Sequence, residues 1–408
     1  MLEMKSRGNR RHIWLIMSIV LIVLAAAGGY FYLKGTTNPL PVEKNKNVVP
    51  VLNIPQPASI YSNMLFTGNI FWGRYINDWS MASPLKTAYP FSRLNEFHRE
   101  QYNAWISGLE CPTKPGVNMT SAEMEAALQF NCSPDYLPQA AKWFTAVSLA
   151  NNHTDNQGVD GFTDTQAQLD RNNIQYFGHY DPRVTEDVCE VISTPVTVTN
   201  TDGSKTDGKL PIAMCGYHGV FRIPPPESVA VMAKYSQYMP VIAMPHMGVE
   251  YKPAPDQLKT DFYRSLIDGG ADVVLGDHPH WIQTTESYKG HLIVYSMGNF
   301  MFDQQDTAEV VRSVAIQVVV STNNDSSQMI KKWLALGEKC ATFHDSCLAD
   351  AEAQGLTKLN LTYKFGAVGS NDSDKIVKPA TAAQMTGILQ RLQWQSTMDK
   401  LSAPYSTL

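Results

Sequence analysis

An uncharged apolar run near the N-terminus constrains this chain more than any other feature. It extends from Ile13 to Leu33, 21 residues without a charge, about the length of helix that crosses the hydrocarbon core of a bilayer. Basic residues dominate the preceding segment 1–12, which favours retention of the N-terminus in the cytoplasm. We therefore predict a cytoplasmic segment over 1–12, a transmembrane anchor over 13–33, and translocation of everything that follows.

A cleaved signal peptide is the alternative interpretation of the same run. The small residues Ala25–Ala27 resemble a signal-peptidase site. The apolar stretch, however, continues through Leu33, beyond the usual length of a signal core. This continuation favours the uncleaved anchor.

The charge balance of the chain excludes one class of partner. Without the charges that flank the apolar run, 28 basic and 37 acidic residues remain, a net charge of about −9. An acidic body of this kind argues against a nucleic-acid-binding protein and against a basic face for anionic lipid. It is compatible with cation binding.

Six cysteines fall into three pairs that are near in sequence. An even number in an exported protein is typical of disulfides, although six cysteines allow 15 connectivities and buried free thiols are an alternative. No C-x-x-C motif occurs, which argues against a thiolate zinc site or a redox motif. The predicted bridges are Cys111–Cys132, Cys189–Cys215 and Cys340–Cys347.

The pattern after the apolar run predicts a linker followed by an α/β domain. Residues 34–59 are rich in Pro, Asn and Lys and predict a linker. We assign residues 60–322 to the main domain and 323–408 to a C-terminal extension that completes it and carries a Cys-containing insertion. Short apolar runs alternate with helical patterns, which predicts an α/β fold with its chemistry on loops at strand ends. The expected strands are Met64–Gly68, Ala104–Leu109, Ala146–Ala150, Ile174–Phe177, Pro211–Cys215, Val241–Met244, Asp272–Leu275, Leu292–Ser296, Val311–Val320 and Leu359–Ala367, and the expected helices are Ser133–Phe144, Gly161–Asn172, Gln257–Ile267 and Thr381–Trp394.

A loop with two histidines is the strongest chemical signal. His278 and His280 directly follow the strand predicted at 272–275, and Pro279 fixes the backbone between them. Neutral imidazole is the commonest metal-ligating side chain, and two imidazoles at one strand end favour ligation over a structural role.

Four other predicted strands end in ligand-type side chains. Asn69, Glu110, Asn152 and His246 each follow such a strand. Taken singly, Asn152 could cap a helix and Glu110 could be solvated. Oxygen and nitrogen ligands from five strand ends together suit a two-metal hydrolytic centre.

Four sequence blocks, in order, resemble the CapA-type poly-γ-glutamate capsule biosynthesis proteins. This family consists of membrane-anchored relatives of the calcineurin-like metallophosphoesterases, and the resemblance covers about residues 65–304. The blocks are Ser148-Leu149-Ala150-Asn151-Asn152-His153-Thr154, His246-Met247-Gly248-Val249-Glu250-Tyr251, His278-Pro279-His280 and Tyr295-Ser296-Met297-Gly298-Asn299-Phe300-Met301-Phe302-Asp303-Gln304.

The resemblance implies a metallophosphatase-like sandwich of two β-sheets flanked by helices, and it implies residue roles. His153 resembles the general acid that protonates a leaving group. Arg74 could contact an anionic substrate or take part in an ion pair. Glu250 could orient a histidine ligand or be a surface carboxylate. The implied metal ligands are Asn69, Glu110, Asn152, His246, His278 and His280.

The chain departs from the family pattern at several of these positions. Asn69 stands where the family has an aspartate, and Gly108 where it has an asparagine. Asn156 stands where an aspartate is expected, although Asp155 is adjacent, and Met247 stands where a tryptophan is expected. Asn69 still offers a carbonyl oxygen but removes one negative charge, so the resemblance implies one or two divalent metal ions, with manganese, zinc or iron as candidates.

The resemblance implies an accessory subunit for synthesis or export of an anionic capsular polymer such as poly-γ-glutamate. Such a protein would be a single-pass protein of the bacterial plasma membrane with its main domain outside. Its partners would be an amide ligase, small membrane proteins and the polymer. The alternatives are a metal-dependent phosphoesterase acting on an envelope substrate and a non-catalytic polymer-binding module with a degenerate metal centre.

Overall fold

The computed structural model describes residues 55–408, which form one compact unit. The predicted anchor at 13–33 lies outside the described residues. Within the described part of the chain, no helix has the length and apolarity needed to span a bilayer.

All fifteen strands of residues 55–408 belong to one hydrogen-bonded network that branches at β1. One path runs β14-β13-β12-β1-β5-β6-β7-β8-β10-β9, and a second leaves β1 through β2, β3 and β4. The strands are β1 (Pro57–Ile70), β2 (Ala104–Leu109), β3 (Ala146–Ser148), β4 (Gln175–Phe177), β5 (Cys189–Asn200), β6 (Lys205–His218), β7 (Val241–His246), β8 (Val273–Leu275), β9 (Thr285–Tyr288), β10 (His291–Val294), β11 (Asn299–Met301), β12 (Arg312–Thr322), β13 (Leu361–Asn371), β14 (Lys378–Pro379) and β15 (Tyr405–Thr407).

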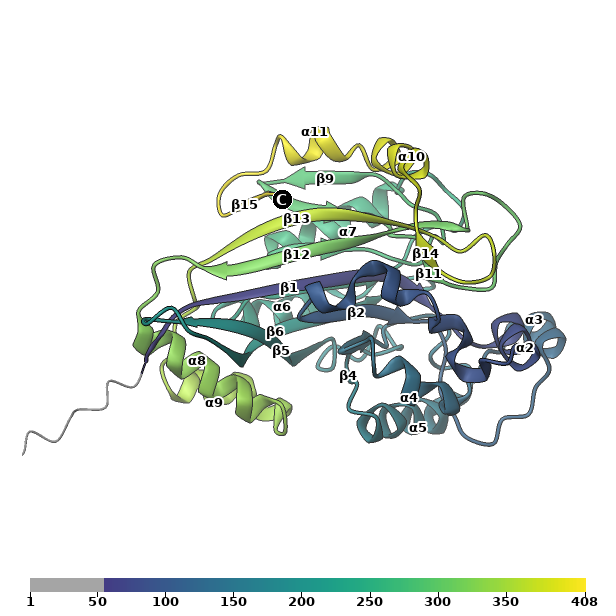
Figure 1. Ribbon diagram of the computed structural model, residues 1–408, viewed down its shortest axis with the longest axis horizontal. Helices are drawn as coiled ribbons and strands as arrows, with labels where there is room; N and C mark the ends of the chain where they lie inside the picture. The colour runs from purple at the N-terminus through teal and green to yellow at the C-terminus, as the bar shows by residue number, and fades with distance from the viewer. Residues whose placement is uncertain (1–54) are drawn as a thin grey trace, which may run out of the picture. The chain divides into compact units, whose positions relative to one another are not determined.

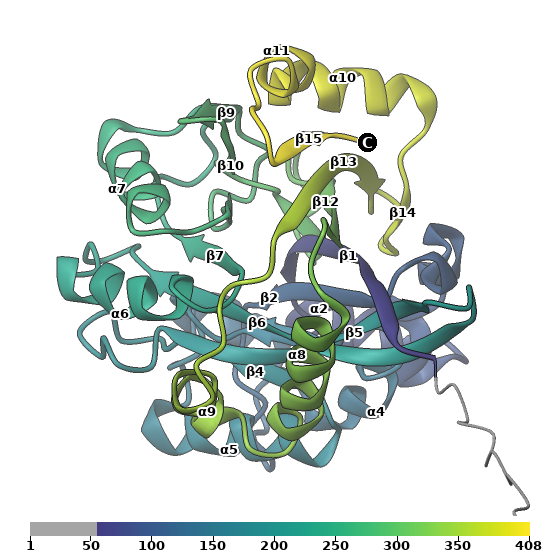
Figure 2. The same cartoon turned by 90° about the vertical axis from the view of Figure 1, so that its left-hand side faces the viewer.

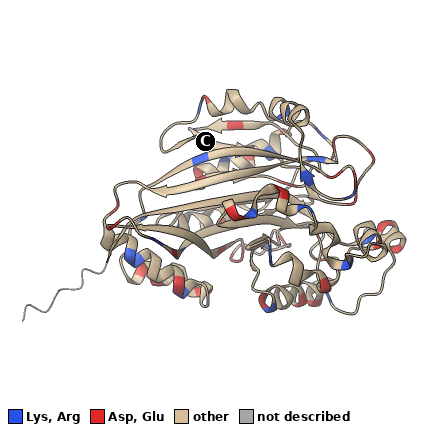
Figure 3. Ribbon diagram, viewed as in Figure 1, with Lys and Arg blue, Asp and Glu red and all other residues tan. Residues whose placement is uncertain are grey.

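Helices cover the strands on several sides, as Figures 1 and 2 show. α8 packs on β5 and β6, while α10 and α11 lie over β13 and β9 at the opposite side of the strands. Charged residues of both signs are found mainly on helices and loops, and the central strands contain few of them (Figure 3). The helices are α2 (Arg74–Ala82), α3 (Ser121–Ala127), α4 (Leu137–Ala140), α5 (Gly158–Arg171), α6 (Pro226–Ser236), α7 (Gln257–Asp268), α8 (Ser327–Cys340), α9 (Cys347–Ala353), α10 (Ala382–Leu392) and α11 (Trp394–Met398), with short 3-10 turns between several of them.

β1 is buried on both faces from Ser62 to Ile70, and this explains its apolar segment Met64–Phe66. Met64 and Phe66 pack in one hydrophobic core, whereas Leu65, on the other face of the strand, packs in a second. Successive side chains of a strand point to opposite faces, so a strand between two cores carries consecutive apolar residues where both faces pack. β2 repeats the pattern, with Ile106 in the first core and Trp105 in the second.

The predicted α/β character is confirmed, and most predicted elements exist. The prediction of one helix over Ser133–Phe144 is wrong, because the structure has a 3-10 turn at Pro134–Tyr136 and the short α4 in its place. A proline near the start of each piece supplies no N–H to continue a longer helix. The sequence analysis also missed β5, α2 and α6.

All three predicted disulfides are present, and the described residues contain no free cysteine. Cys189 and Cys215 are partners in the β5–β6 register. Cys340–Cys347 joins the end of α8 to the start of α9.

Candidate functional site

Strand register places Asn69 beside two other strand ends. Asn69 of β1 is opposite Gly108 of β2 on one side and opposite Asn299 of β11 on the other. The residue before Asn69 must be glycine, because a Cβ at Gly68 would lie 1.8 Å from the carbonyl oxygen of Gly298. The amide of Asn69 is fully buried, and neither of its polar atoms has a hydrogen bond.

Glu110 directly follows β2 and is buried in the same region. Its Oε1 lies 3.6 Å from Nε2 of His280. Burial raises the pKa of Glu110 well above its usual value, and the nearby carboxyl of Asp277 raises it further. Neither carboxyl oxygen has a hydrogen bond of normal geometry among the described residues.

Three ligand-type atoms from different strand ends converge on one point. Nε2 of His246, at the end of β7, lies 2.8 Å from Oδ1 of Asn152 and 3.2 Å from Nδ1 of His278. Asn152 follows β3, and its neighbour Asn151 approaches Nδ1 of His246 at 3.3 Å. The two nitrogens and the amide oxygen are atoms that divalent transition metals bind.

The loop that carries His278 and His280 has an unusual backbone. φ is +88° at His278 and +59° at His280, in a region that few residues other than glycine adopt. Each such residue costs on the order of 1–3 kcal/mol, and conformations of this kind cluster at functional sites. With this backbone conformation, the ring of His278 lies beside His246 and the ring of His280 lies beside Glu110.

A hydrogen bond fixes the ring of His280. Its Nδ1 is 2.7 Å from Oδ1 of Asn299, so Nδ1 carries the proton and donates it. Nε2 is left with its lone pair toward Glu110, and Glu250 lies 3.8 Å away on the same side. Asn299 rather than Glu250 therefore holds the nitrogen that does not face the centre.

The electrostatic state of these residues suits a cation. Burial lowers the pKa of His246 and His278 well below the usual value and that of His280 to about 4, so all three are neutral at pH 7. Neutral imidazole is the form that binds metals. Burial raises the pKa of Glu110 and Asp277, and a divalent cation would favour their ionised forms.

Unpaired buried atoms provide a test of fit for a metal. Both polar side-chain atoms of Asn69, Glu110 and Asp277 are buried without a hydrogen bond of normal geometry in the described structure. Buried polar groups are normally paired, so three unpaired side chains in one place require an explanation. A cation among them satisfies that requirement, and the residues present therefore fit a divalent metal.

His153 lies on the wall of the cleft next to Asn152. Its Nδ1 is 2.9 Å from Oδ1 of Asn156, which also accepts a bond from the backbone N–H of Phe130. Asn156 thus fills the position where the resemblance implied an aspartate. Burial lowers the pKa of His153 to about 4, so the imidazole is neutral at pH 7 unless an anion binds beside it.

Arg74 forms a buried ion pair. Its Nε and Nη2 donate to the two carboxylate oxygens of Asp303 at 2.9 and 2.6 Å. Its guanidinium also lies 4.4 Å from the ring centroid of Phe130. The sequence analysis left two roles open for Arg74, contact with an anionic substrate or an ion pair. The structure shows the ion pair, which is buried.

A cleft of about 500 Å³ opens over these residues. Arg74, Glu110, Asn152, His153 and His280 line its polar part. The apolar part of its rim consists of Leu128, Phe221 and Tyr251, and the exposed polar residues Gln129, Asp155 and Glu250 line it as well. The cleft therefore offers apolar, acidic and imidazole side chains to a ligand.

The structure adds residues that the sequence analysis did not assign to the site. His218 ends β6 beside His246, and its Nε2 is buried without a hydrogen bond. Asn299, as described above, holds His280. His218 could have been found as one more polar residue at a strand end, but the predicted strand stopped three residues earlier.

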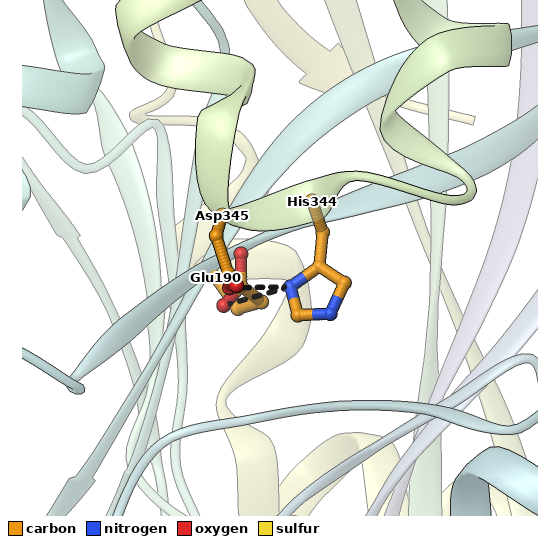
Figure 4. A group of neighbouring side chains, drawn as sticks. All are labelled: Glu190, His344 and Asp345. Atoms are coloured by element: carbon orange, nitrogen blue, oxygen red, sulfur yellow. Dashed lines mark ion pairs between the residues drawn. The ribbon is translucent and has the colours of Figure 1, made fainter. Parts of the chain in front are cut away.

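A second group of histidine and carboxylates lies elsewhere. Nδ1 of His344, in the turn between α8 and α9, is 3.2 Å from Glu190 of β5 and 3.0 Å from Asp345 (Figure 4). Asp345 is almost fully exposed and His344 partly so. Glu190 raises the pKa of His344, so this group is an ion pair that docks the turn on the sheet.

Comparisons with known proteins agree on one family. The model of the family described as "Bacterial capsule synthesis protein PGA_cap" matches residues 63–205 and 226–304. The "PGA biosynthesis protein CapA" of Bacillus subtilis is 28% identical over 245 residues, which cover 59% of this chain and 63% of that protein. The "Capsule biosynthesis protein CapA" of Bacillus anthracis is 23% identical over 311 residues, which cover 73% of this chain and 70% of that protein. The chain thus spans less than two thirds of the length of the Bacillus subtilis relative.

Proposed function

Because this chain belongs to the bacterial capsule synthesis protein family PGA_cap, we propose that it is an accessory protein for synthesis or export of an anionic capsular polymer such as poly-γ-glutamate. We further propose that the body acts outside the plasma membrane, tethered by the segment 13–33. Its partners would be an amide ligase, small membrane proteins and the polymer itself. The fold we propose is the metallophosphatase-like sandwich, which the branched strand network with β1 between two cores supports.

A divalent metal is part of the proposal. We propose that Asn152, His246 and His278 hold it on one side of the centre, and that Asn69, Glu110 and His280 contribute on the other. The observation that carries this proposal is the convergence of His246, His278 and Asn152 within about hydrogen-bond distance beside buried, unpaired carboxyls. A bound metal would supply a Lewis acid or an activated water.

The protein's own residues set what can happen in the cleft. Arg74 and Asp303 fix the wall next to Phe130. Asn156 holds Nδ1 of His153, so the neutral imidazole leaves its Nε2 lone pair free; it can take up and donate a proton once a bound anion raises its pKa from about 4. The apolar part of the rim can pack against the methylene groups of a polyanionic chain.

Metal analysis combined with a capsule assay tests this proposal. We expect Glu110→Ala and His280→Ala to lower the metal content of the purified full-length chain by at least half, since each removes a proposed ligand. In the native host, deletion of the gene should abolish the cell-surface polymer, and the wild-type gene but neither variant should restore it. Wild-type metal content in both variants would contradict the metal centre, and an unchanged capsule after deletion would contradict the capsule role.

The phosphoesterase alternative has one specific observation in its favour, the neutral His153 at the cleft wall beside the proposed metal ligand Asn152. Hydrolysis of an aryl phosphodiester by the metal-loaded protein, lost in His153→Ala with metal content unchanged, would favour that alternative. Absence of hydrolysis together with retained polymer binding would favour the non-catalytic binding module.

A further inference from the structure

Asp277 is a buried carboxyl that the proposed ligand set does not include. It lies between β8 and His278, and only 4% of its surface is exposed. Neither of its carboxyl oxygens has a hydrogen bond of normal geometry within residues 55–408. A buried carboxyl without such a partner requires an explanation, because buried polar groups are normally hydrogen-bonded.

Asp277 lies beside Gly108 and Asn69, two of the positions at which the chain departs from the pattern of the family that it resembles. A Cβ added to Gly108 would lie 2.9 Å from Oδ2 of Asp277 and 3.6 Å from Oδ1 of Asn69. The carboxyl of Asp277 and the amide of Asn69 therefore border the same small space. That space exists because residue 108 has no side chain, and a larger residue there would require the carboxyl of Asp277 to move.

A lysine is the competing partner for Asp277. The side chain of Lys259 is buried in the same region, and its Nζ donates a hydrogen bond to Oε1 of Gln283 at 3.0 Å. No ion pair within 4.0 Å joins Lys259 to Asp277 in the described structure. Direct contact with Lys259 therefore does not neutralise the carboxylate.

We propose that Asp277 is a ligand of the metal centre and supplies, from the end of β8, the carboxylate that Asn69 does not supply at the end of β1. The exchange conserves the anionic charge of the centre while it moves that charge across the sheet. Gly108 makes the exchange possible by leaving room for the carboxyl. This inference rests on the proposed metal centre and names one more residue of it.

Metal binding by matched variants tests the inference. The full-length chain, stripped with EDTA and titrated with Mn²⁺, should bind Mn²⁺ at least about tenfold more weakly as Asp277→Asn, a loss of about 1.4 kcal/mol. Asp277→Glu should retain more of the affinity than Asp277→Asn because it keeps the charge. The double variant Asn69→Asp/Asp277→Asn should recover affinity to within about threefold of the wild type, since the carboxylate returns to β1.

Asp372 provides the control. Its carboxyl is also buried without a hydrogen bond of normal geometry, but it lies beyond the end of β13, near Phe302 and Asp303, and does not line the cleft. Asp372→Asn should leave the affinity for Mn²⁺ unchanged. The melting temperature of each metal-free variant measures folding stability separately. If Asp277 is a structural partner of Lys259, the melting temperature of metal-free Asp277→Asn should be lower.

The outcomes separate this inference from the proposed function. Wild-type affinity for Mn²⁺ in Asp277→Asn, with affinity lost in Glu110→Ala, would overturn the role of Asp277 and leave the metal centre in place. A lower melting temperature of metal-free Asp277→Asn with unchanged affinity would assign Asp277 to Lys259 and also overturn it. No binding of Mn²⁺, Zn²⁺ or Fe²⁺ by the wild type would overturn both proposals.

Discussion

The ion pair between Arg74 and Asp303 allows a quantitative test of whether Arg74 stabilises the cleft wall or contacts a substrate. The side chain of Asp303 is 2% exposed and that of Arg74 is 10% exposed, and two hydrogen bonds join them. Substitution Arg74→Met removes the guanidinium but keeps an extended apolar side chain. The carboxylate of Asp303 is then left buried without its counter-ion.

The expected cost follows from this burial. Removal of one partner of a buried pair typically destabilises a protein by about 3–5 kcal/mol. The double variant Arg74→Met/Asp303→Asn leaves no unpaired charge, so it should be more stable than the sum of the single effects by about 2 kcal/mol, within the range of coupled neighbours. Burial already raises the pKa of Asp303 and Arg74 opposes that rise, so the pKa should be higher still in Arg74→Met.

The raised pKa of Asp303 determines how the stability loss in Arg74→Met depends on pH. A carboxyl whose pKa is higher in the folded than in the unfolded state stabilises the fold at low pH and loses that contribution as the pH rises through the folded pKa. The deficit of Arg74→Met should therefore shrink when the pH falls from 7 to 5. Urea unfolding followed by tryptophan fluorescence, with the disulfides intact, measures both effects.

Arg264 provides the matched control. It also pairs with a carboxylate, that of Glu286, but its side chain is 40% exposed. Arg264→Met should cost no more than about 1 kcal/mol. If Arg74→Met costs as little as Arg264→Met while binding of an anionic polymer falls, the reasoning from burial is wrong and Arg74 acts as a substrate contact.

Three further predictions concern other parts of the chain. Asn69→Asp should bind Mn²⁺ at least about tenfold more tightly, because it adds an anionic oxygen ligand, and unchanged metal content by mass spectrometry would mean that Asn69 only shapes the loop. Glu190 raises the pKa of His344, so the stabilisation from this pair is complete below the usual histidine pKa and is lost as the pH rises through the raised value; the dependence of the melting temperature on pH should weaken in Glu190→Gln. In right-side-out spheroplasts, added protease should digest the body and spare the first dozen residues, whereas full protection of the body would contradict the proposed topology.

Local sequence patterns determined much of the architecture. β2 has the predicted bounds, and α7 begins at the predicted residue, because a buried strand and an amphipathic helix each leave a short-range signal. The disulfide partners could be paired because they are near in sequence. The strand β5 was missed because its alternating threonines and its proline obscure the apolar run.

The ligand-type residues could likewise be predicted, but not their partners. His246, His278, Asn152 and Glu110 each follow a recognisable strand, and the carboxyl ends of parallel strands meet at one edge of a sheet. The sequence by itself therefore determined that these four residues gather, but not that His218, Asn299 and Asp277 join them.

Only the tertiary structure decided how those residues meet. The pairing of Arg74 with Asp303 joins residues 229 positions apart, and the approach of Asp277 to Gly108 depends on strands β8 and β2, which are not neighbours in the network. Such contacts depend on strand order and register, which are set by the packing of the whole core and leave no mark in a short stretch of sequence. For the same reason, the lone pair that His280 turns toward Glu110 follows from Asn299 on another strand and could not be inferred from the histidine motif alone.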